Sequence, residues 1–137
     1  ADDGGLEIAA LNGEPGLKSR RWLGHNATDD ELITHMKKIA ATLPDTKRKA
    51  FFKASISLAL PDGKVWSVLG EIEGIIAKKP SLNELKGFPY RSFFFIPEIN
   101  KYYFETELTP EEQKNYNHRV KALNQLKPIL KKELGLV

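Results

Sequence analysis

The feature that most constrains the fold is an alternation of apolar and polar side chains over residues 50–60. Apolar residues occupy every even position there, namely Ala50, Phe52, Ala54, Ile56, Leu58 and Leu60. Between them stand the polar residues Lys53, Ser55 and Ser57. Successive side chains of a strand point to opposite faces of a sheet, so this period of two predicts a β-strand with one buried face.

A second strand is predicted directly after the first. Pro61-Asp62-Gly63 has the composition of a turn, and residues 64–77 then carry apolar side chains at Trp66, Val68, Ile72 and Ile76. Gly70 and Gly74 interrupt this strand, which indicates a bulge, a bend or the close approach of other backbone. Glu71 and Glu73 share its other face, where they form either a solvated surface or an acid–base pair.

A helix is predicted over 29–43, before the hairpin. Thr28 and Glu31 have the spacing of a capping box, and Pro44 ends the helix. Met36 belongs to the apolar stripe and is expected in the core, whereas His35 lies off the stripe and is expected at the surface.

A further helix is predicted over 110–134. Thr109 is a suitable N-cap, Pro110 suits the first helical position, and Pro128 is expected to kink or interrupt the helix. Its apolar stripe would consist of Tyr116, Val120, Leu123, Leu130 and Leu134.

Shorter segments complete the predicted fold. Leu6–Leu11 has the pattern of a short apolar strand, and Asn12–Gly16 has the residues of a tight turn. Phe93–Ile96 is predicted as a buried strand because aromatic and branched side chains suit a sheet, and Glu98–Thr106 as an extended, hairpin-like segment. We therefore expect one α/β domain over residues 1–137, with a twisted mixed β-sheet flanked by helices.

Composition limits the kinds of function. A chain of 137 residues with 41% hydrophobic content suits one globular domain. The absence of cysteine excludes disulfides and thiolate metal sites and fits a reducing compartment. No run of about 18 apolar residues occurs, so no membrane span is expected. The net charge of +3 is compatible with a nucleotide ligand but too small to indicate nucleic-acid binding.

Three groups of residues are candidates for chemistry. Asp2 and Asp3 stand before a glycine pair, and they are either solvated or open to Mg²⁺, which binds one or two carboxylates in proteins. Phe88 and Tyr90 precede a buried strand, where they either stack on a flat ligand or close an edge of the core. The pair His118-Arg119 either lies at the surface or holds a phosphate or a base carbonyl.

Four blocks of the sequence, in order along the chain, resemble the inosine/xanthosine triphosphate pyrophosphatases. The first, ADDGGLEIAALNGEPGLKSRRWLG, is similar to the family's ADDSGLxVxALxGxPGxxSARYxG. The second is the glycine-spaced strand Gly70–Gly74 with the two isoleucines after it. The third, GFPYRSFFFIP, is similar to GFGYDPxFFxP, and the fourth, ELTPEEQKNYNHRVKAL, to ELTxEEKxxxSHRxxAL. Together they span almost the whole of residues 1–137.

The resemblance implies an elongated, two-lobed fold of which this chain would be the C-terminal two-thirds. The family begins with a strand and an S/T-G-N-x-x-K loop that cradles the triphosphate, and a metal-binding Glu follows. All of these would precede Ala1. We therefore expect the chain from Ala1 alone to bind nucleoside triphosphates weakly and to turn them over poorly or not at all.

The resemblance also implies roles for individual residues. Asp3 matches the family's general base and magnesium ligand, and Asp2 matches the acid beside it. The residues that match the family's substrate-binding positions are Gly4, Phe88, Pro89, Tyr90, Arg91, Gln113, Lys114, His118 and Arg119.

Several of these positions depart from the family's pattern. Gly4 replaces a Ser and lacks its hydroxyl group, and Gln113 replaces a Lys. Lys114 is adjacent to Gln113 but points about 100° around the helix. Pro89 and Arg91 replace Gly and Asp, and Arg91 reverses a charge at the base pocket, so the preferred base is left open.

The implied activity is Mg²⁺-dependent hydrolysis of non-canonical purine nucleoside triphosphates of the ITP, dITP and XTP type, to the monophosphate and pyrophosphate. Phe88 would stack on the purine, while His118 and Arg119 would donate to its 6-oxo oxygen. The implied protein is a cytoplasmic homodimer without stable nucleic-acid or membrane binding. The alternative is a non-catalytic nucleotide-binding relic of the same fold, which the departures favour.

Overall fold

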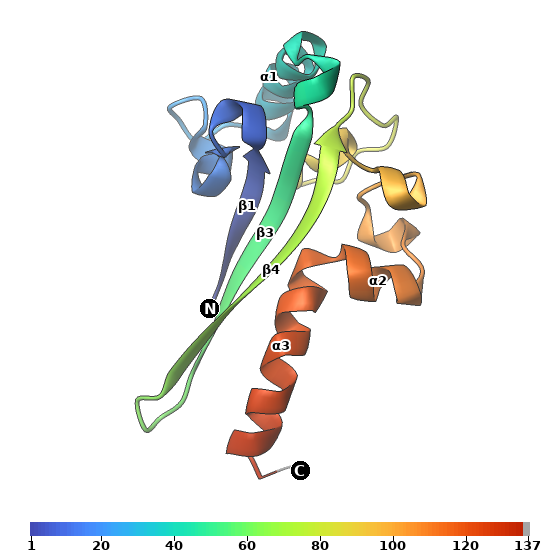
Figure 1. Cartoon of the computed structure of the whole chain (residues 1–137). Helices are drawn as coiled ribbons and strands as arrows, with labels where there is room; N and C mark the ends of the chain where they lie inside the picture. Colours follow the sequence, from blue (N-terminus) through green and yellow to red (C-terminus); the bar gives the residue numbers. More distant parts are fainter. Residues whose placement is uncertain (136–137) are drawn as a thin grey trace.

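A computed structural model describes residues 1–135 as a six-stranded sheet with helices around it (Figure 1). The strands lie in the order β2-β1-β3-β4-β5-β6. They are β1 (Asp2–Ile8), β2 (Glu14–Pro15), β3 (Lys49–Ala59), β4 (Val65–Ile76), β5 (Phe94–Ile96) and β6 (Lys101–Tyr102). The α-helices are α1 (Asp29–Thr42), α2 (Pro110–Tyr116) and α3 (His118–Glu133). Short 3₁₀ segments cover Ala9–Leu11, Gly16–Arg21, Asp45–Lys47, Arg91–Phe93, Pro97–Ile99 and Glu105–Glu107.

The predicted hairpin forms the long axis of the molecule. β3 and β4 pair antiparallel along their whole length. The end of the hairpin that carries the turn extends beyond the rest of the sheet (Figure 1). Gly63 makes the turn at a φ of 91°. The predicted α/β class, with helices around a twisted sheet, is confirmed. Every strand pairing that the structure describes within residues 1–135 is antiparallel, so the sheet is not mixed in direction there.

The first strand begins earlier than predicted. β1 starts at Asp2 and ends at Ile8, while Ala9–Leu11 form a 3₁₀ turn. β1 pairs with β3 over its whole length. Glycine is needed at Gly4, where an added Cβ would lie 2.3 Å from the carbonyl oxygen of Lys53. The acidic pair therefore belongs to a strand and not to a turn.

The larger core lies between the sheet and α1. The capping box of Thr28 and Glu31 is present, and Met36 is fully buried, as predicted. His35 was expected at the surface, but that expectation is wrong: it is half-buried, with its ring centroid 4.7 Å from that of Trp22. The main buried members of this core are Leu6, Ile8, Leu32, Ile33, Met36, Ala40, Phe52, Ile72, Ile76, Phe93, Phe94, Ile96 and Tyr103.

The predicted last helix is interrupted at Asn117 and not at Pro128. Asn117 has extended backbone, and its Oδ1 accepts hydrogen bonds from the backbone N–H groups of Arg119 and Val120, so it caps α3. α3 then continues through Pro128. None of the helices in residues 1–135 has the length and apolarity needed to cross a bilayer.

The buried face of α3 differs from the predicted one. Ala122 and Leu126 pack with Ile56 in a smaller core, whereas Leu123 is 49% exposed. The predicted stripe through Leu123 and Leu134 is therefore wrong, because the face that packs on the sheet carries Ala122 and Leu126, and Ala122 lies about 100° around the helix from Leu123.

α3 packs on β4 at a glycine. An added Cβ at Gly70 would lie 2.0 Å from the carbonyl oxygen of His118 and 2.7 Å from the backbone nitrogen of Ala122. At Gly74 it would lie 2.5 Å from the ring of Phe94. The predicted close approach at these glycines is confirmed, and it brings the first turn of α3 against the sheet.

Arg48 joins the end of α1 to the end of β4. Its buried guanidinium donates to the carbonyl oxygens of Ala40, Leu43 and Ile76. Ala40 lies in the last turn of α1 and Leu43 directly follows it, where carbonyl groups lack intrahelical donors. A single side chain therefore satisfies three backbone acceptors that would otherwise be left unpaired.

We expect Arg48→Met to lower the free energy of unfolding by about 3 kcal/mol or more, because each bond to a charged donor contributes about 1.5–3 kcal/mol. Urea unfolding followed by circular dichroism measures the change. Lys47→Met, at the exposed neighbouring position, is the control and should change stability by less than about 0.5 kcal/mol. Equal stabilities of the two variants would contradict the role given to Arg48.

Candidate functional site

A cavity of about 220 Å³ lies between β1, the segment 87–91 and the first turn of α3. The predicted site residues that line it are Gly4, Phe88, Pro89, Tyr90, Arg91, His118 and Arg119. Three arginines line it, namely Arg20, Arg91 and Arg119, but none of the acidic residues within 1–135 does. The cavity is therefore positively charged and bordered by aromatic rings.

An ion pair that binds the backbone of Gly87 positions Phe88 at this cavity. Arg20 and Asp29 form an ion pair of 2.5 Å. Arg20 Nη2 also donates to the carbonyl oxygen of Gly87 at 3.0 Å, and Gly87 N–H donates to Asp29 Oδ2 at 2.7 Å. The bond from Gly87 lowers the pKa of the Asp29 carboxyl group. Because the backbone is held on both sides, the position of Phe88 is set by charged groups from two other segments.

The two candidate aromatic residues have different roles. Phe88 is 45% exposed and can stack on a flat ligand. Tyr90 is 6% exposed, and its hydroxyl group donates to the carbonyl oxygen of Ser19. Burial raises the pKa of Tyr90 to about 12, so the hydroxyl keeps its proton. Tyr90 therefore closes an edge of the core.

His118 is buried, and both of its ring nitrogens have polar partners. Its Nδ1 lies 2.7 Å from the hydroxyl oxygen of Tyr103, and the same oxygen accepts from the backbone N–H of His118. A guanidinium group only donates, so the contact of Arg119 Nη1 with Nε2 makes Nε2 an acceptor, and the proton of the ring then lies on Nδ1, facing Tyr103. Burial, with Arg91 and Arg119 nearby, lowers the pKa of His118 to about 3. The ring is therefore neutral at pH 7.

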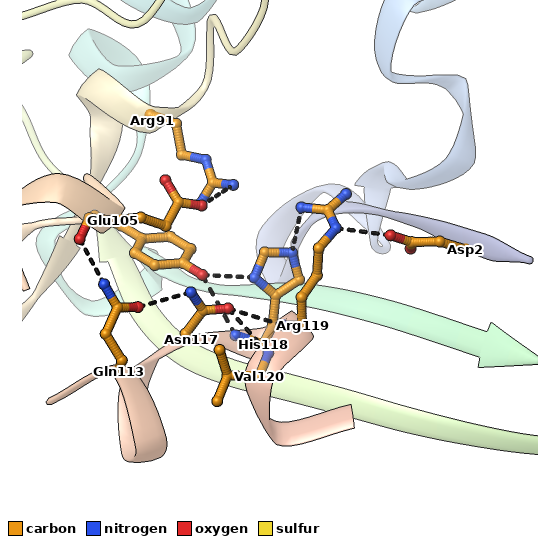
Figure 2. A network of polar contacts seen from close by, with 9 residues as sticks. Asp2, Arg91, Glu105, Gln113, Asn117, His118, Arg119 and Val120 are labelled. Atoms are coloured by element: carbon orange, nitrogen blue, oxygen red, sulfur yellow. Dashed lines mark hydrogen bonds and ion pairs between the residues drawn. The ribbon is translucent and has the colours of Figure 1, made fainter. Parts of the chain in front are cut away.

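Arg119 places a donor beside His118. Its Nη1 lies 3.4 Å from His118 Nε2, and its Nε donates to Asp2 Oδ2 at 2.9 Å (Figure 2). Asp2 thus orients the guanidinium from β1. Arg119 Nη1 therefore donates to His118 Nε2 at the edge of the cavity, and both residues line the cavity.

The two predicted acidic ligands lie on opposite faces of β1. Asp2 pairs with Arg119, whereas Asp3 lines a separate depression of about 380 Å³ with Glu7 and Lys53. Neighbouring strand residues alternate between faces, so the structure does not bring the two carboxylates together. In the part of the chain that is described, no cluster of three or more His, Asp or Glu side chains could hold a metal ion.

Gln113 and Lys114 do not line the cavity. Gln113 donates from Nε2 to the carbonyl oxygen of Glu105, and its Oε1 accepts from Asn117 Nδ2 at 2.8 Å (Figure 2). It therefore braces the junction of α2 and α3. Lys114 is exposed on α2.

Arg91 is buried where the resemblance implied an acidic residue. It is 2% exposed, and its Nη2 pairs with Glu105 Oε1 at 2.8 Å. The guanidinium lies over the rings of Phe52 and Tyr103, at 4.7 Å and 4.2 Å from the ring centroids. A pair of aromatic faces and a carboxylate thus hold this charge inside the protein.

Sequence reasoning missed Arg20, which lines the cavity, and the residues that support the cavity from behind. The supporting residues are Asp29, Tyr103, Glu105 and Asn117. Asn117 had a detectable signal, because Asn directly before a helical pattern is a preferred N-cap. The others act through contacts between distant segments and had none.

Glu71 and Glu73 lie outside the cavity, on an exposed face of β4. They face Lys53 and Lys49 across the strands, at 3.8 Å and 3.6 Å. Of the two interpretations of this acidic pair, the structure favours a solvated surface.

The buried neutral histidine predicts a pH dependence of stability. Between pH 6.5 and 3 the unfolded chain binds a proton at residue 118 that the folded chain excludes, so stability falls as the pH falls. From pH 7 to 4.5 we expect this residue to remove about 2–3 kcal/mol. Urea unfolding at both pH values should show a smaller loss in His118→Gln than in wild type. Equal losses would contradict a neutral His118.

Comparison with known proteins agrees with this geometry. Residues 1–129 match the model of the Ham1 family. The chain is 42% identical over 126 residues to a dITP/XTP pyrophosphatase of Thermus thermophilus, covering 92% of this chain and 58% of that protein. It is 37% identical over 134 residues to a dITP/XTP pyrophosphatase of Staphylococcus epidermidis, covering 97% and 65%.

Solved structures agree as well. The Staphylococcus aureus Ham1 protein matches with a TM-score of 0.78 and 34% identity, covering 97% of this chain and 66% of that one. A HAM1 protein from Coxiella burnetii matches with a TM-score of 0.76 and 37% identity, covering 96% and 66%. The chain thus spans 58% to 66% of the length of these relatives. The resemblance seen in the four sequence blocks is confirmed, and the chain belongs to the Ham1 family.

Proposed function

We propose that this chain carries the purine-binding part of an enzyme that hydrolyses non-canonical purine nucleoside triphosphates to the monophosphate and pyrophosphate. The observation that carries the proposal is the position of Arg119 Nη1 and His118 Nε2, which lie 3.4 Å apart on a cavity that Phe88 also lines. A purine ring stacked on Phe88 would accept a hydrogen bond from Arg119 Nη1 at its 6-oxo oxygen, and a second from His118 when the ring proton moves from Nδ1 to Nε2. The relatives named dITP/XTP pyrophosphatase support the same substrate class.

The guanidinium of Arg119 makes this contact selective. Adenine carries an amino group at the 6-position, so it would leave this partly buried donor without an acceptor, at a cost of about 1 kcal/mol or more. A site that hydrogen-bonds an oxygen rejects the analogue that lacks it far more strongly than an apolar pocket does. Inosine and xanthosine nucleotides are therefore favoured over ATP.

Asp3 is the residue that we assign to the metal and to the attacking water. It is exposed on β1, and none of the residues described here forms a hydrogen bond or ion pair with it. Mg²⁺ is usually bound by one or two carboxylates together with phosphate oxygens and water, so a single carboxylate fits it. The ion would neutralise phosphate charge when bound. Asp3 would accept the proton of water at a carboxylate oxygen.

Mg²⁺ dependence, a homodimeric assembly, a cytoplasmic location and the absence of nucleic-acid and membrane binding stay predictions from the family resemblance. The alternative, a nucleotide-binding relic without turnover, is supported by two observations. Asp2 is already paired with Arg119, and Gln113 bonds within the protein.

Pyrophosphate release with ITP, XTP and ATP separates the two functions. The assay is run on this chain and on a chimera that adds the part of the Thermus thermophilus relative that the chain does not cover. Release from ITP and XTP in either protein supports an enzyme. Binding of ITP without release in both would support the relic.

In whichever protein is active, we expect Asp3→Asn to reduce turnover about a thousandfold, since an amide neither ligates Mg²⁺ well nor takes a proton, which amounts to about 4 kcal/mol of transition-state stabilisation. Asp30→Asn, which changes an exposed carboxylate of α1, is the matched control and should retain full turnover. More than a tenth of wild-type turnover in Asp3→Asn would refute the assignment.

A further inference from the structure

The cavity is lined by a buried charge that the proposed function does not use. Arg91 Nη2 is paired with Glu105, but Nη1 is buried and has no hydrogen-bond partner among the described residues. An unpaired buried donor costs free energy, and the fold could have avoided it with an apolar side chain between Phe52 and Tyr103. The contrast with Arg48 is plain, because all three of that guanidinium's nitrogens donate to carbonyl groups.

The charge of the cavity indicates what Nη1 would bind. Arg20, Arg91 and Arg119 line it, while the carboxylates that partner them, Asp29, Glu105 and Asp2, stand outside the lining. His118 adds a neutral imidazole. A ligand with several oxygen acceptors, or with negative charge spread over its ring, suits this lining better than one with amino groups.

We propose that Arg91 is a specificity-determining residue that makes the pocket prefer xanthine, by donating from Nη1 to the carbonyl oxygen that xanthine carries at its 2-position. The proposal rests on the proposed function, in which His118 and Arg119 hold the 6-oxo oxygen. Those two donors cannot distinguish xanthine, hypoxanthine and guanine, because all three bases carry that oxygen. The 2-position separates them, since xanthine has an oxygen there, hypoxanthine a hydrogen and guanine an amino group.

Arg91 thereby also excludes guanine. An amino group brought to Nη1 would place two donors against each other in a buried site, and neither would be satisfied. The affinity for xanthine is raised further because its ring loses a proton near neutral pH. The resulting negative charge would lie among three guanidinium groups. The guanidinium of Arg91 lies 5.4 Å from the Phe88 ring, so movement of this exposed ring onto a base would open Nη1 to it.

The test is an equilibrium titration of the ¹⁵N-labelled chain with XMP, IMP and GMP, and with AMP as the control, followed by NMR up to millimolar nucleotide. We expect wild type to bind XMP about ten- to a hundredfold more tightly than IMP, the effect of one charge-assisted hydrogen bond. GMP should bind more weakly than IMP. The side-chain Nε–H signal of Arg91 should shift with XMP and much less with IMP.

Arg91→Met should abolish the preference for XMP and bring GMP to the affinity of IMP, while leaving IMP within about threefold of wild type. Arg21→Met, which removes an exposed arginine outside the cavity, is the matched control and should keep the wild-type order. If Arg91→Met fails to fold, Arg91→Lys keeps the charge beside Glu105 but removes Nη1, and it should lose most of the preference.

The outcomes separate this proposal from the proposed function. Equal affinities of XMP and IMP in wild type, or a preference that survives in the Arg91 variants, would overturn the role of Arg91 and leave the 6-oxo contact standing. Binding of none of the three nucleotides, or an AMP affinity equal to that of IMP, would overturn the base pocket itself.

Discussion

The contact between α3 and β4 at Gly70 is the constraint on which the site depends. The absence of a side chain lets the carbonyl oxygen of His118 and the backbone of Ala122 approach the strand, so that an added Cβ would lie 2.0 Å from that oxygen. Asn117 begins α3 at this point by capping two N–H groups. His118 and Arg119 are therefore placed by backbone packing, and their side chains meet Tyr103 and Asp2 as a consequence (Figure 2).

Charged groups from distant segments then complete the cavity. Arg20 and Asp29 form hydrogen bonds with the backbone of Gly87. Glu105 forms an ion pair with Arg91. These ion pairs are partly buried, where the removal of one partner leaves a charge without compensation. Burial keeps His118 neutral, and the arginines that give the cavity its positive charge add to this effect. Both disfavour a positive charge on the imidazole.

Much of the fold could be predicted because its signals are local. The alternation of residues 50–60, the turn at Pro61–Gly63, the capping box at Thr28 and the N-cap at Thr109 all appear in the structure. The resemblance named seven of the thirteen residues that line the cavity. It also named Gln113 and Lys114, which the structure places elsewhere, because a motif records residue types and not the direction of their side chains.

The sequence by itself determined the hairpin of β3 and β4 and the starts of α1 and α2, since each depends on neighbours a few residues apart, and its four motifs identified the family. Tertiary structure decided the interruption at Asn117, the separation of Asp2 from Asp3 and the burial of Arg91 between Phe52 and Tyr103. These features join residues that are far apart in the chain, and their energies depend on desolvation and packing. A buried charge can be recognised only when the groups that surround it are in place.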